Sequence, residues 1–195
     1  GMANGPRGAE GAANVGVIVA NPKNGEILAM ATDNPYDLNN PRDLTSYYSQ
    51  DEINGMDNDT MLKNLYGIWK NYCISDAFEP GSTVKPLTIG AALDADVVQP
   101  SDTFVCDGYQ MFGGTRIRCS IYPGAHGTET LSDLIKHSCN DGLMQIGALL
   151  GPEEFLKYQK IFNFGATTGI DLPGEATGIL HTEESLSSGS TELAS

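Results

Sequence analysis

Two short apolar runs lie near the start of the chain, at residues 15–20 and 26–31. Each has the length of a strand, and Asn24-Gly25 between them is the dipeptide that most favours a tight hairpin turn. The pattern therefore predicts a β-hairpin of two buried strands.

The polarity changes over residues 32–60. Acidic residues far outnumber basic ones there, and two prolines and several asparagines interrupt both the helical and the strand period. We expect a long, largely irregular segment whose acids form a solvated face.

Helical spacing of apolar residues begins after Pro80 and continues to about residue 95. Pro86 is tolerated only in the first turn of a helix, where its missing N–H has no partner to lose. The helix is therefore expected to begin close to Ser82. Residues 100–127 predict an irregular or β-rich segment.

Three further helices are expected downstream. Thr130 and Asp133 have the spacing of a capping box, which predicts a helix up to about His137. Residues 141–150 form the next helix, which Gly151 ends, and a third begins at Pro152.

The predicted domain organisation follows from these boundaries. Residues 15–181 are expected to form one partial domain. Residues 1–14 are expected to be a disordered or added leader, and residues 182–195 a polar tail at a point of truncation.

The charge balance excludes some classes of function. The formal net charge is −14, and 11 Lys and Arg residues are spread over the whole chain. Binding to phosphate groups of nucleic acid needs clustered basic residues, as does binding to anionic membranes. We therefore expect no nucleic-acid partner.

The four cysteines match no zinc or redox pattern, since no C-x-x-C pair occurs and the histidines lie elsewhere in the sequence. No metal site and no cofactor are expected. Cys106 and Cys119 flank a glycine-rich segment that predicts a hairpin able to bring the two sulfurs together. A disulfide and two free thiols remain alternatives, and an extracytoplasmic location would favour the disulfide.

Candidate chemistry begins with Ser82 and Lys85, three residues apart at a predicted helix start. A serine hydroxyl needs an adjacent base to act as a nucleophile, and a lysine amine becomes one when desolvation lowers its pKa. Side chains three apart share a helix face, and backbone N–H groups at a helix start can stabilise an oxyanion. An isolated S-x-x-K more often marks a solvated lysine. The surrounding Glu-Pro-Gly-Ser-Thr-Val-Lys-Pro at residues 79–86 favours the catalytic interpretation.

A second element, Ser138-Cys139-Asn140, lies at the junction of two predicted helices. Serine and asparagine are also common helix caps, which is the structural alternative. Serine–x–asparagine combined with S-x-x-K is nevertheless typical of penicillin-binding proteins and serine β-lactamases. We therefore favour a functional role for both residues.

Several segments together resemble the transpeptidase domain of class B penicillin-binding proteins. Residues 17–31 are similar to its opening strand pair, residues 36–41 to the stretch that follows, and residues 69–85 to the entry of its catalytic helix. His126-Gly127, Ser138–Asn140 and Thr-Gly-Ile-Asp-Leu-Pro-Gly-Glu at residues 168–175 complete the series in the order of the family. The resemblance covers roughly residues 15–181.

The resemblance implies an α/β (α+β) fold of the penicillin-binding protein and serine β-lactamase type, with the helical subdomain and the first strands of the sheet. It implies a peptidoglycan D,D-transpeptidase in which Ser82 attacks D-Ala-D-Ala stem peptides, with Lys85 as base. Ser138 would relay a proton near the leaving group, and Asn140 would hold a substrate amide. β-Lactam antibiotics would acylate the same serine.

One family motif is missing. None of the seven lysines is followed by Thr-Gly or Ser-Gly. In the family that Lys-Thr-Gly strand supplies the second oxyanion donor and binds the substrate carboxylate, and it normally lies beyond the position of residue 195. The sheet is therefore expected to be incomplete and the chain inactive alone.

The resemblance also implies partners and a location. We expect peptidoglycan stem peptides, β-lactams and proteins of the division or elongation machinery as partners, and a parent protein held at the extracytoplasmic face of the membrane by an amino-terminal helix. An exposed edge of the incomplete sheet could form a dimer. The alternatives are a β-lactam sensor or hydrolase with the same S-x-x-K chemistry and a non-catalytic partner-binding domain.

Overall fold

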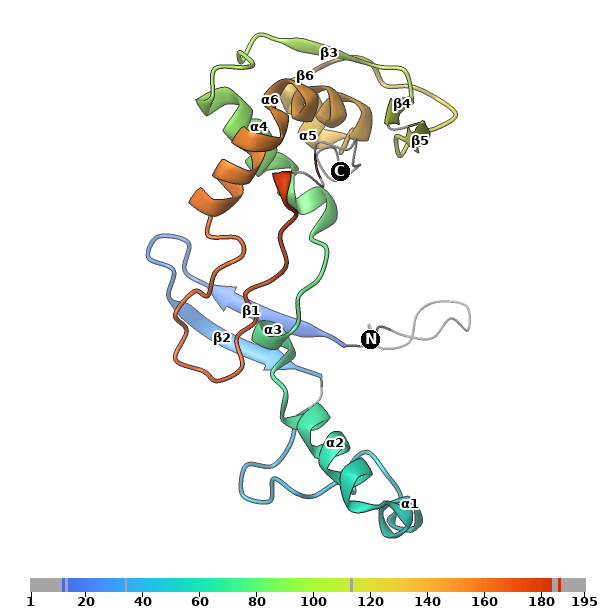
Figure 1. Ribbon diagram of the computed structural model, residues 1–195, viewed down its shortest axis with the longest axis vertical. Helices are drawn as coiled ribbons and strands as arrows, with labels where there is room; N and C mark the ends of the chain where they lie inside the picture. Colours follow the sequence, from blue (N-terminus) through green and yellow to red (C-terminus); the bar gives the residue numbers. More distant parts are fainter. Residues whose placement is uncertain (1–11, 13, 34, 113, 184–185, 187–195) are drawn as a thin grey trace. The chain divides into compact units, whose positions relative to one another are not determined.

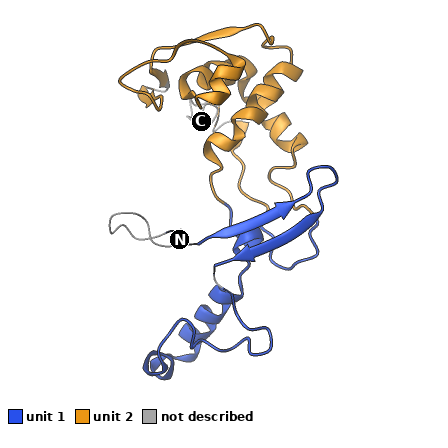
Figure 2. Cartoon of the chain, turned by 180° about the vertical axis from the view of Figure 1, so that it is seen from behind, with its two compact units in different colours: residues 1–77, 169–176 blue, residues 78–168, 177–195 orange. Residues whose placement is uncertain are grey.

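The computed structural model describes residues 12, 14–33, 35–112, 114–183 and 186. The chain divides into two compact units, one of residues 1–77 with 169–176 and one of residues 78–168 with 177–195 (Figure 2). Most of the predicted leader and most of the predicted tail lie outside the described residues.

The first unit contains a β-hairpin and three helices (Figure 1). β1 (Gly16–Ala20) pairs antiparallel with β2 (Ile27–Thr32), and α1 (Gln50–Gly55), α2 (Asn58–Trp69) and α3 (Tyr72–Ser75) follow. The predicted hairpin is confirmed, with Gly25 at a φ of 75° in the turn. That left-handed conformation is the reason for a glycine there.

The prediction that both hairpin strands are buried is wrong. All five residues of β1 are exposed, and Val17 and Leu28 keep 53% and 60% of their surface accessible. Among the described residues of this unit the sheet has two strands, and the four-residue α3 contacts both of them. A short helix cannot cover the two faces of a hairpin, so side chains of both strands stay accessible.

The prediction for residues 32–60 is wrong at its carboxyl end. Ser49 and Glu52 form a capping box that starts α1, and Asp57 accepts the backbone N–H of Thr60 at the start of α2. Both caps satisfy backbone donors that a helix start leaves free. α2 buries Leu65 and Ile68 against Leu44.

The second unit contains the helices and short strands of the candidate site. A 3₁₀ turn, η1 (Gly81–Val84), leads into α4 (Lys85–Asp94). β3 (Thr103–Cys106) pairs antiparallel with β6 (Gly127–Thr130), and β4 (Tyr109–Phe112) with β5 (Thr115–Arg118). α5 (Leu131–Lys136) and α6 (Asn140–Ile161) complete the unit, and α6 packs against α4.

Three local predictions for this unit are confirmed. Pro86 lies in the first turn of α4, and Thr130 forms its capping box with Asp133. Gly151 adopts a φ of 76° and interrupts α6 where the sequence predicted one helix to end and another to begin.

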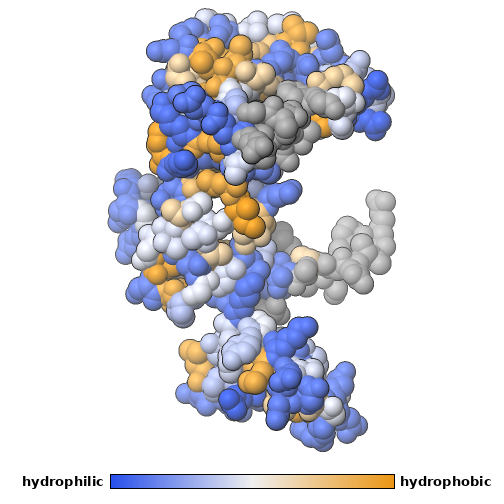
Figure 3. All heavy atoms as spheres, in the orientation of Figure 1, coloured by the Kyte–Doolittle hydropathy of each residue, from blue (hydrophilic) through white to orange (hydrophobic). Residues whose placement is uncertain are grey.

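Two apolar clusters hold the second unit together. The first joins α4, α5 and α6 with β3, and three of its buried members are cysteines. The second packs Ala91 of α4 against Leu150, Phe155 and Tyr158 of α6. Leu186, from the segment expected to be a polar tail, is also buried in this second cluster. Elsewhere apolar side chains remain at the surface among hydrophilic ones (Figure 3).

Candidate active site

Lys85, the first residue of α4, lies at the centre of the candidate site and is 4% exposed. Its Nζ donates hydrogen bonds to Ser138 O (2.9 Å), Ser138 Oγ (3.1 Å) and Asn140 Oδ1 (2.5 Å). A lysine ammonium carries three protons, and these three acceptors take all of them. The structure therefore brings Lys85 of the first motif into contact with Ser138 and Asn140 of the second.

Ser82 lies one turn before Lys85, on η1, with its side chain exposed. In a 3₁₀ turn residues three apart lie on the same side, so the Ser82 and Lys85 side chains share a face. The Lys85 backbone N–H bonds to Ser82 O. Among the described residues, no hydrogen bond joins the Ser82 hydroxyl to Lys85.

The turn that presents Ser82 has local causes. Gly81 adopts a φ of 56°, a left-handed conformation that an L side chain rarely takes. The Thr83 hydroxyl donates to Pro80 O (2.7 Å) and closes the turn. Pro86 supplies a backbone angle suited to the first turn of α4.

Ser138 occupies the junction of α5 and α6, between the carboxyl cap of α5 and the amino cap of α6. Its φ of 51° lies in the left-handed region, which few residues other than glycine occupy. Strain of this kind is often found at functional sites. Here the turn directs both the carbonyl and the hydroxyl oxygen of Ser138 at one amine.

Asn140 is the first residue of α6, and both polar atoms of its side-chain amide form hydrogen bonds. Its Oδ1 accepts from Lys85, and its Nδ2 donates to Arg118 O at the end of β5 (3.2 Å). The amide plane is therefore fixed between α4 and the β4–β5 hairpin.

Burial lowers the pKa of Lys85 below its ordinary value of 10.5, because the interior disfavours the charged amine. The nearby Cys119 and Cys139 oppose this change, since a negative charge on either sulfur would favour the ammonium. Burial has the larger effect. The amine therefore loses its proton more readily than a solvated lysine, as a general base requires.

Asp141 also shapes the site, although nothing in the sequence pattern singled it out. Its carboxylate is fully buried and accepts from Asp107 N (2.8 Å), Gln110 Nε2 (2.7 Å) and Gln145 Nε2 (2.8 Å). These bonds tie the first turn of α6, next to Asn140, to the segment after β3. An acid in the first turn of a helix is common, which is why its position alone carried no functional signal.

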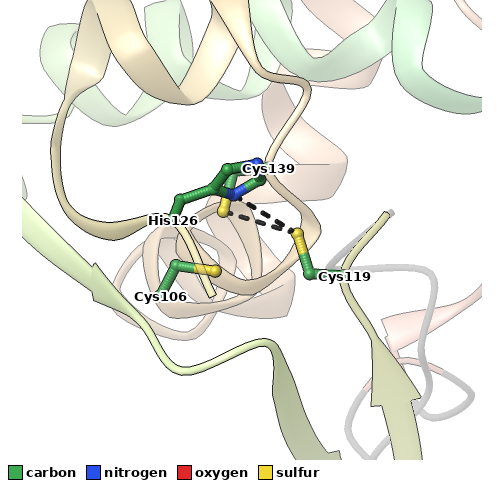
Figure 4. A group of neighbouring side chains, drawn as sticks. All are labelled: Cys106, Cys119, His126 and Cys139. Atoms are coloured by element: carbon green, nitrogen blue, oxygen red, sulfur yellow. Dashed lines mark hydrogen bonds between the residues drawn. The ribbon is translucent and has the colours of Figure 1, made fainter. Parts of the chain in front are cut away.

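Three cysteines and one histidine gather behind the junction that carries Ser138 and Asn140 (Figure 4). Cys106, Cys119 and Cys139 are free thiols, with 3.8 Å between the Sγ atoms of Cys119 and Cys139. His126 Nδ1 lies 3.7 Å from Cys119 Sγ. Of the two alternatives for Cys106 and Cys119, the structure has the free thiols. The spacing of the cysteines and histidines in the sequence matched no zinc pattern, but the fold brings His126 next to Cys119.

Residues 15–194 match the family model of the penicillin-binding protein transpeptidase domain. The chain belongs to this family. This penicillin-binding protein domain is 40% identical over 164 residues to stage V sporulation protein D of Bacillus subtilis, a match that covers 84% of this chain and 22% of the relative. It is 28% identical over 166 residues to the probable peptidoglycan D,D-transpeptidase PenA of Neisseria flavescens, covering 85% of this chain and 36% of the relative.

Solved structures show the same fold. Penicillin-binding protein 3 of Mycobacterium tuberculosis, crystallised with aztreonam, superimposes with a TM-score of 0.71 at 27% identity, over 92% of this chain and 36% of that one. The D,D-transpeptidase domain of a peptidoglycan glycosyltransferase from Eggerthella lenta gives 0.69 at 24% identity, over 90% and 39%. The predicted fold class is confirmed. The penicillin-binding protein domain spans between 22% and 36% of the two curated relatives.

Proposed function

We propose that this chain supplies the nucleophile, base and proton relay of a peptidoglycan D,D-transpeptidase. One observation carries the proposal: the buried amine of Lys85 bonds to Ser138 Oγ and Asn140 Oδ1, although the two motifs lie far apart in the sequence. Membership of the transpeptidase family and the relatives named D,D-transpeptidases support the reaction class.

In the proposed acylation, Ser82 Oγ attacks the carbonyl carbon of the terminal D-Ala-D-Ala bond of a stem peptide. Lys85 takes the hydroxyl proton, which requires the neutral amine that burial favours. The tetrahedral intermediate then breaks the C–N bond. Ser138 passes a proton to the leaving nitrogen, and D-alanine departs.

The second half of the reaction transfers the acyl group. An amine of a neighbouring stem peptide attacks the ester on Ser82, the C–O bond breaks, and the Ser82 oxygen regains a proton through the same Lys85–Ser138 pair. A new peptide cross-link results. A β-lactam would form an ester with Ser82 in the same way when its ring amide opens.

The chain carries no Lys-Thr-Gly or Lys-Ser-Gly sequence. In the family that segment contributes one oxyanion donor and the site for the substrate carboxylate. Loss of one oxyanion donor lowers the rate by about 10²–10³-fold. We therefore propose that the chain alone is inactive in cross-linking and that Ser82 is acylated slowly at most.

Covalent labelling with a fluorescent penicillin tests both parts of the proposal. We expect slow appearance of one adduct per chain, and peptide mapping should place it on Ser82. The Ser82→Ala variant should give no adduct, whereas Ser120→Ala, a serine after β5, should label like the unchanged chain.

Each other outcome has a distinct meaning. Equal labelling of the Ser82→Ala variant would refute Ser82 as nucleophile. Rapid labelling of the unchanged chain would refute the expected slowness alone. Rapid release of the adduct as hydrolysed penicillin would favour a β-lactam hydrolase over a transpeptidase.

Location and partners are part of the same proposal. Stem peptides are extracytoplasmic, so the enzyme would work on that face of the membrane, together with proteins of division or elongation. Among the described residues, none of the helices combines the length and hydropathy that crossing a bilayer requires. The exposed strands of the β1–β2 hairpin would allow two copies to associate.

A further inference from the structure

The cluster of Cys106, Cys119, His126 and Cys139 has the dimensions of a tetrahedral metal site. One ligand atom from each residue lies within 4.8 Å of all the others. Two thiolates about 2.3 Å from one zinc ion are about 3.8 Å apart, and a thiolate and an imidazole nitrogen are about 3.6 Å apart. The Cys119–Cys139 and Cys119–His126 separations are 3.8 Å and 3.7 Å.

The donor atoms and their burial also suit zinc. The three cysteines are between 0% and 3% exposed, and the His126 side chain is 11% exposed. Three thiolates with one imidazole form a closed structural zinc site, in which no position is left for water or substrate. A sulfur–sulfur distance of 3.8 Å is well beyond the bond of about 2.05 Å in a disulfide.

Each ligand comes from a different segment of the second unit, as Figure 4 shows. Cys106 ends β3, Cys119 follows β5, His126 precedes β6, and Cys139 is the amino cap of α6. The two sheets in this unit have two strands of four residues each, and such small sheets are marginally stable alone. A shared ion would cross-link all four segments.

A second layer of side chains holds His126. Its ring stacks on His137, with centroids 5.1 Å apart and 16° between the planes. Glu129, 2% exposed, places Oε1 2.6 Å from His137 Nδ1 and Oε2 3.5 Å from His126 Nδ1. Glu129 Oε2 has no hydrogen-bond partner among the described residues. Because Nδ1 is the ring nitrogen that faces Cys119, Glu129 orients His126 through its bond to the stacked His137 and does not accept the N–H of the other His126 ring nitrogen.

Backbone N–H groups near the three sulfurs favour thiolates, the forms that bind metal, whereas burial opposes them. The Gly142 N–H donates to Cys139 Sγ (3.4 Å). Burial raises the pKa of Cys119, but neighbouring backbone N–H groups, including that of Asp141, outweigh it and lower the pKa to about 6. Burial raises the pKa of Cys106 and Cys139 in the metal-free cluster. A bound cation would reverse that effect.

We propose that Cys106, Cys119, His126 and Cys139 bind one zinc ion in a closed tetrahedral site. Cys139 lies between Ser138 and Asn140, so ligation fixes the backbone that presents these two residues to Lys85. This consequence for the active site rests on the proposed function, whereas the binding of zinc does not.

Metal content and cobalt substitution test the site directly. Protein kept reduced and free of oxygen should contain one zinc per chain. After removal of zinc with a chelator, cobalt(II) should produce the thiolate charge-transfer and tetrahedral ligand-field bands, and added zinc should abolish them. A reduced protein that takes up neither ion, or that shows only octahedral cobalt, would overturn the proposal.

The cysteine outside the cluster provides a matched control. Cys106→Ser and His126→Ala should lose or alter the tetrahedral spectrum, whereas Cys73→Ser should keep it. Glu129→Gln should keep the spectrum, because Glu129 bonds to His137 and is not one of the four proposed ligands. Circular dichroism of each variant separates loss of ligation from loss of folding. An unchanged spectrum in folded Cys106→Ser and His126→Ala would refute these ligands.

Labelling by penicillin tests the transpeptidase proposal separately from the zinc proposal. If Ser82 never acylates while cobalt binds as expected, the zinc site stands and the transpeptidase role fails. If the chelated and zinc-loaded proteins acylate Ser82 at the same rate, the link between zinc and Ser138 is refuted.

Discussion

Ser138 combines a strained backbone with a side chain that the proposed relay uses. Its φ of 51° would be relaxed in glycine, but glycine would lack the hydroxyl that bonds to Lys85 Nζ. A serine at this position therefore keeps a functional hydroxyl at the cost of a strained backbone, as is common at functional sites.

Two substitutions separate these contributions. Ser138→Ala loses the hydroxyl and keeps the strain, whereas Ser138→Gly loses both. Because the left-handed conformation disfavours a residue with a Cβ, we expect Ser138→Gly to be about 1 kcal/mol more stable than Ser138→Ala. Urea unfolding of the two variants measures the difference. Both should acylate more slowly than the unchanged chain, and a more stable alanine variant would contradict the account.

The lowered pKa of Lys85 sets the expected pH dependence of acylation. Burial disfavours the ammonium, so the neutral base becomes populated at a lower pH than in a solvated lysine. The rate of Ser82 labelling should therefore rise with pH, with a midpoint below 10.5. Mass spectrometry of the adduct over time gives the rate at each pH.

Lys85→Arg is the matched variant for this prediction. Arginine keeps the positive charge but does not lose its proton in proteins. The rising part of the pH profile should therefore disappear together with most of the labelling. A profile that is unchanged in this variant would exclude Lys85 as the base.

Single residues also show what sequence reasoning could reach. Ser82, Lys85, Ser138 and Asn140 were found because each pair lies within one short local motif. The cysteine cluster was missed because its ligands come from four segments that only the folded chain brings together. No local spacing encodes such a set, and the same is true of the partners of Asp141.

At the scale of elements, the sequence predicted boundaries best where one side chain or one backbone angle decides them. The Thr130 capping box, the early Pro86 and the break at Gly151 are of this kind. Ser49 and Glu52 have the same capping-box spacing, but the helix that they start was not predicted because prolines and acids dominate the surrounding segment. Burial of β1 and β2 depends on which other elements cover them, and the apolar pattern of the two strands does not contain that information.

The crossing of α5 and α6 depends on a glycine. A Cβ added at Gly142 would lie 2.2 Å from Leu134 Cδ2, and Leu134 is fully buried. Gly142→Ala should therefore destabilise the chain by about 1–3 kcal/mol. Thermal or urea unfolding measures this loss.

Gly90 in α4 supplies the control for that substitution. It is exposed, and an added Cβ would meet no atom within 4 Å. Gly90→Ala should stabilise the helix by about 0.5–1 kcal/mol, because alanine has less backbone freedom to lose on folding. Opposite signs for the two variants are expected, and equal signs would refute close packing at Gly142.

At the scale of the whole molecule, the chain contributes to the two units in turn. It leaves the first unit after residue 77 and returns to it for residues 169–176. The returning segment bonds to the end of α3 through Ala176 N and Ile74 O (2.8 Å). All four predicted site residues lie in the second unit, so the geometry of the candidate site is internal to that unit.

Self-association should depend on two opposing properties of the whole chain. A net charge of −14 makes two copies repel, whereas the exposed apolar strands β1 and β2 favour contact. Salt reduces the screening length from about 10 Å at 0.1 M to about 3 Å at 1 M. We therefore expect a monomer at low salt and a growing fraction of dimer at high salt, as measured by sedimentation velocity.

Charge-neutral substitutions identify the surface responsible, because they leave the repulsion unchanged. Val19→Thr with Leu28→Gln removes apolar surface from the hairpin, and Leu149→Gln removes a similarly exposed side chain from α6. If the hairpin drives association, only the first variant should stay monomeric at high salt. Equal dimer formation in both variants would place the contact outside the hairpin. Dimer formation that weakens as salt increases would also do so, because salt does not weaken a contact made by apolar side chains.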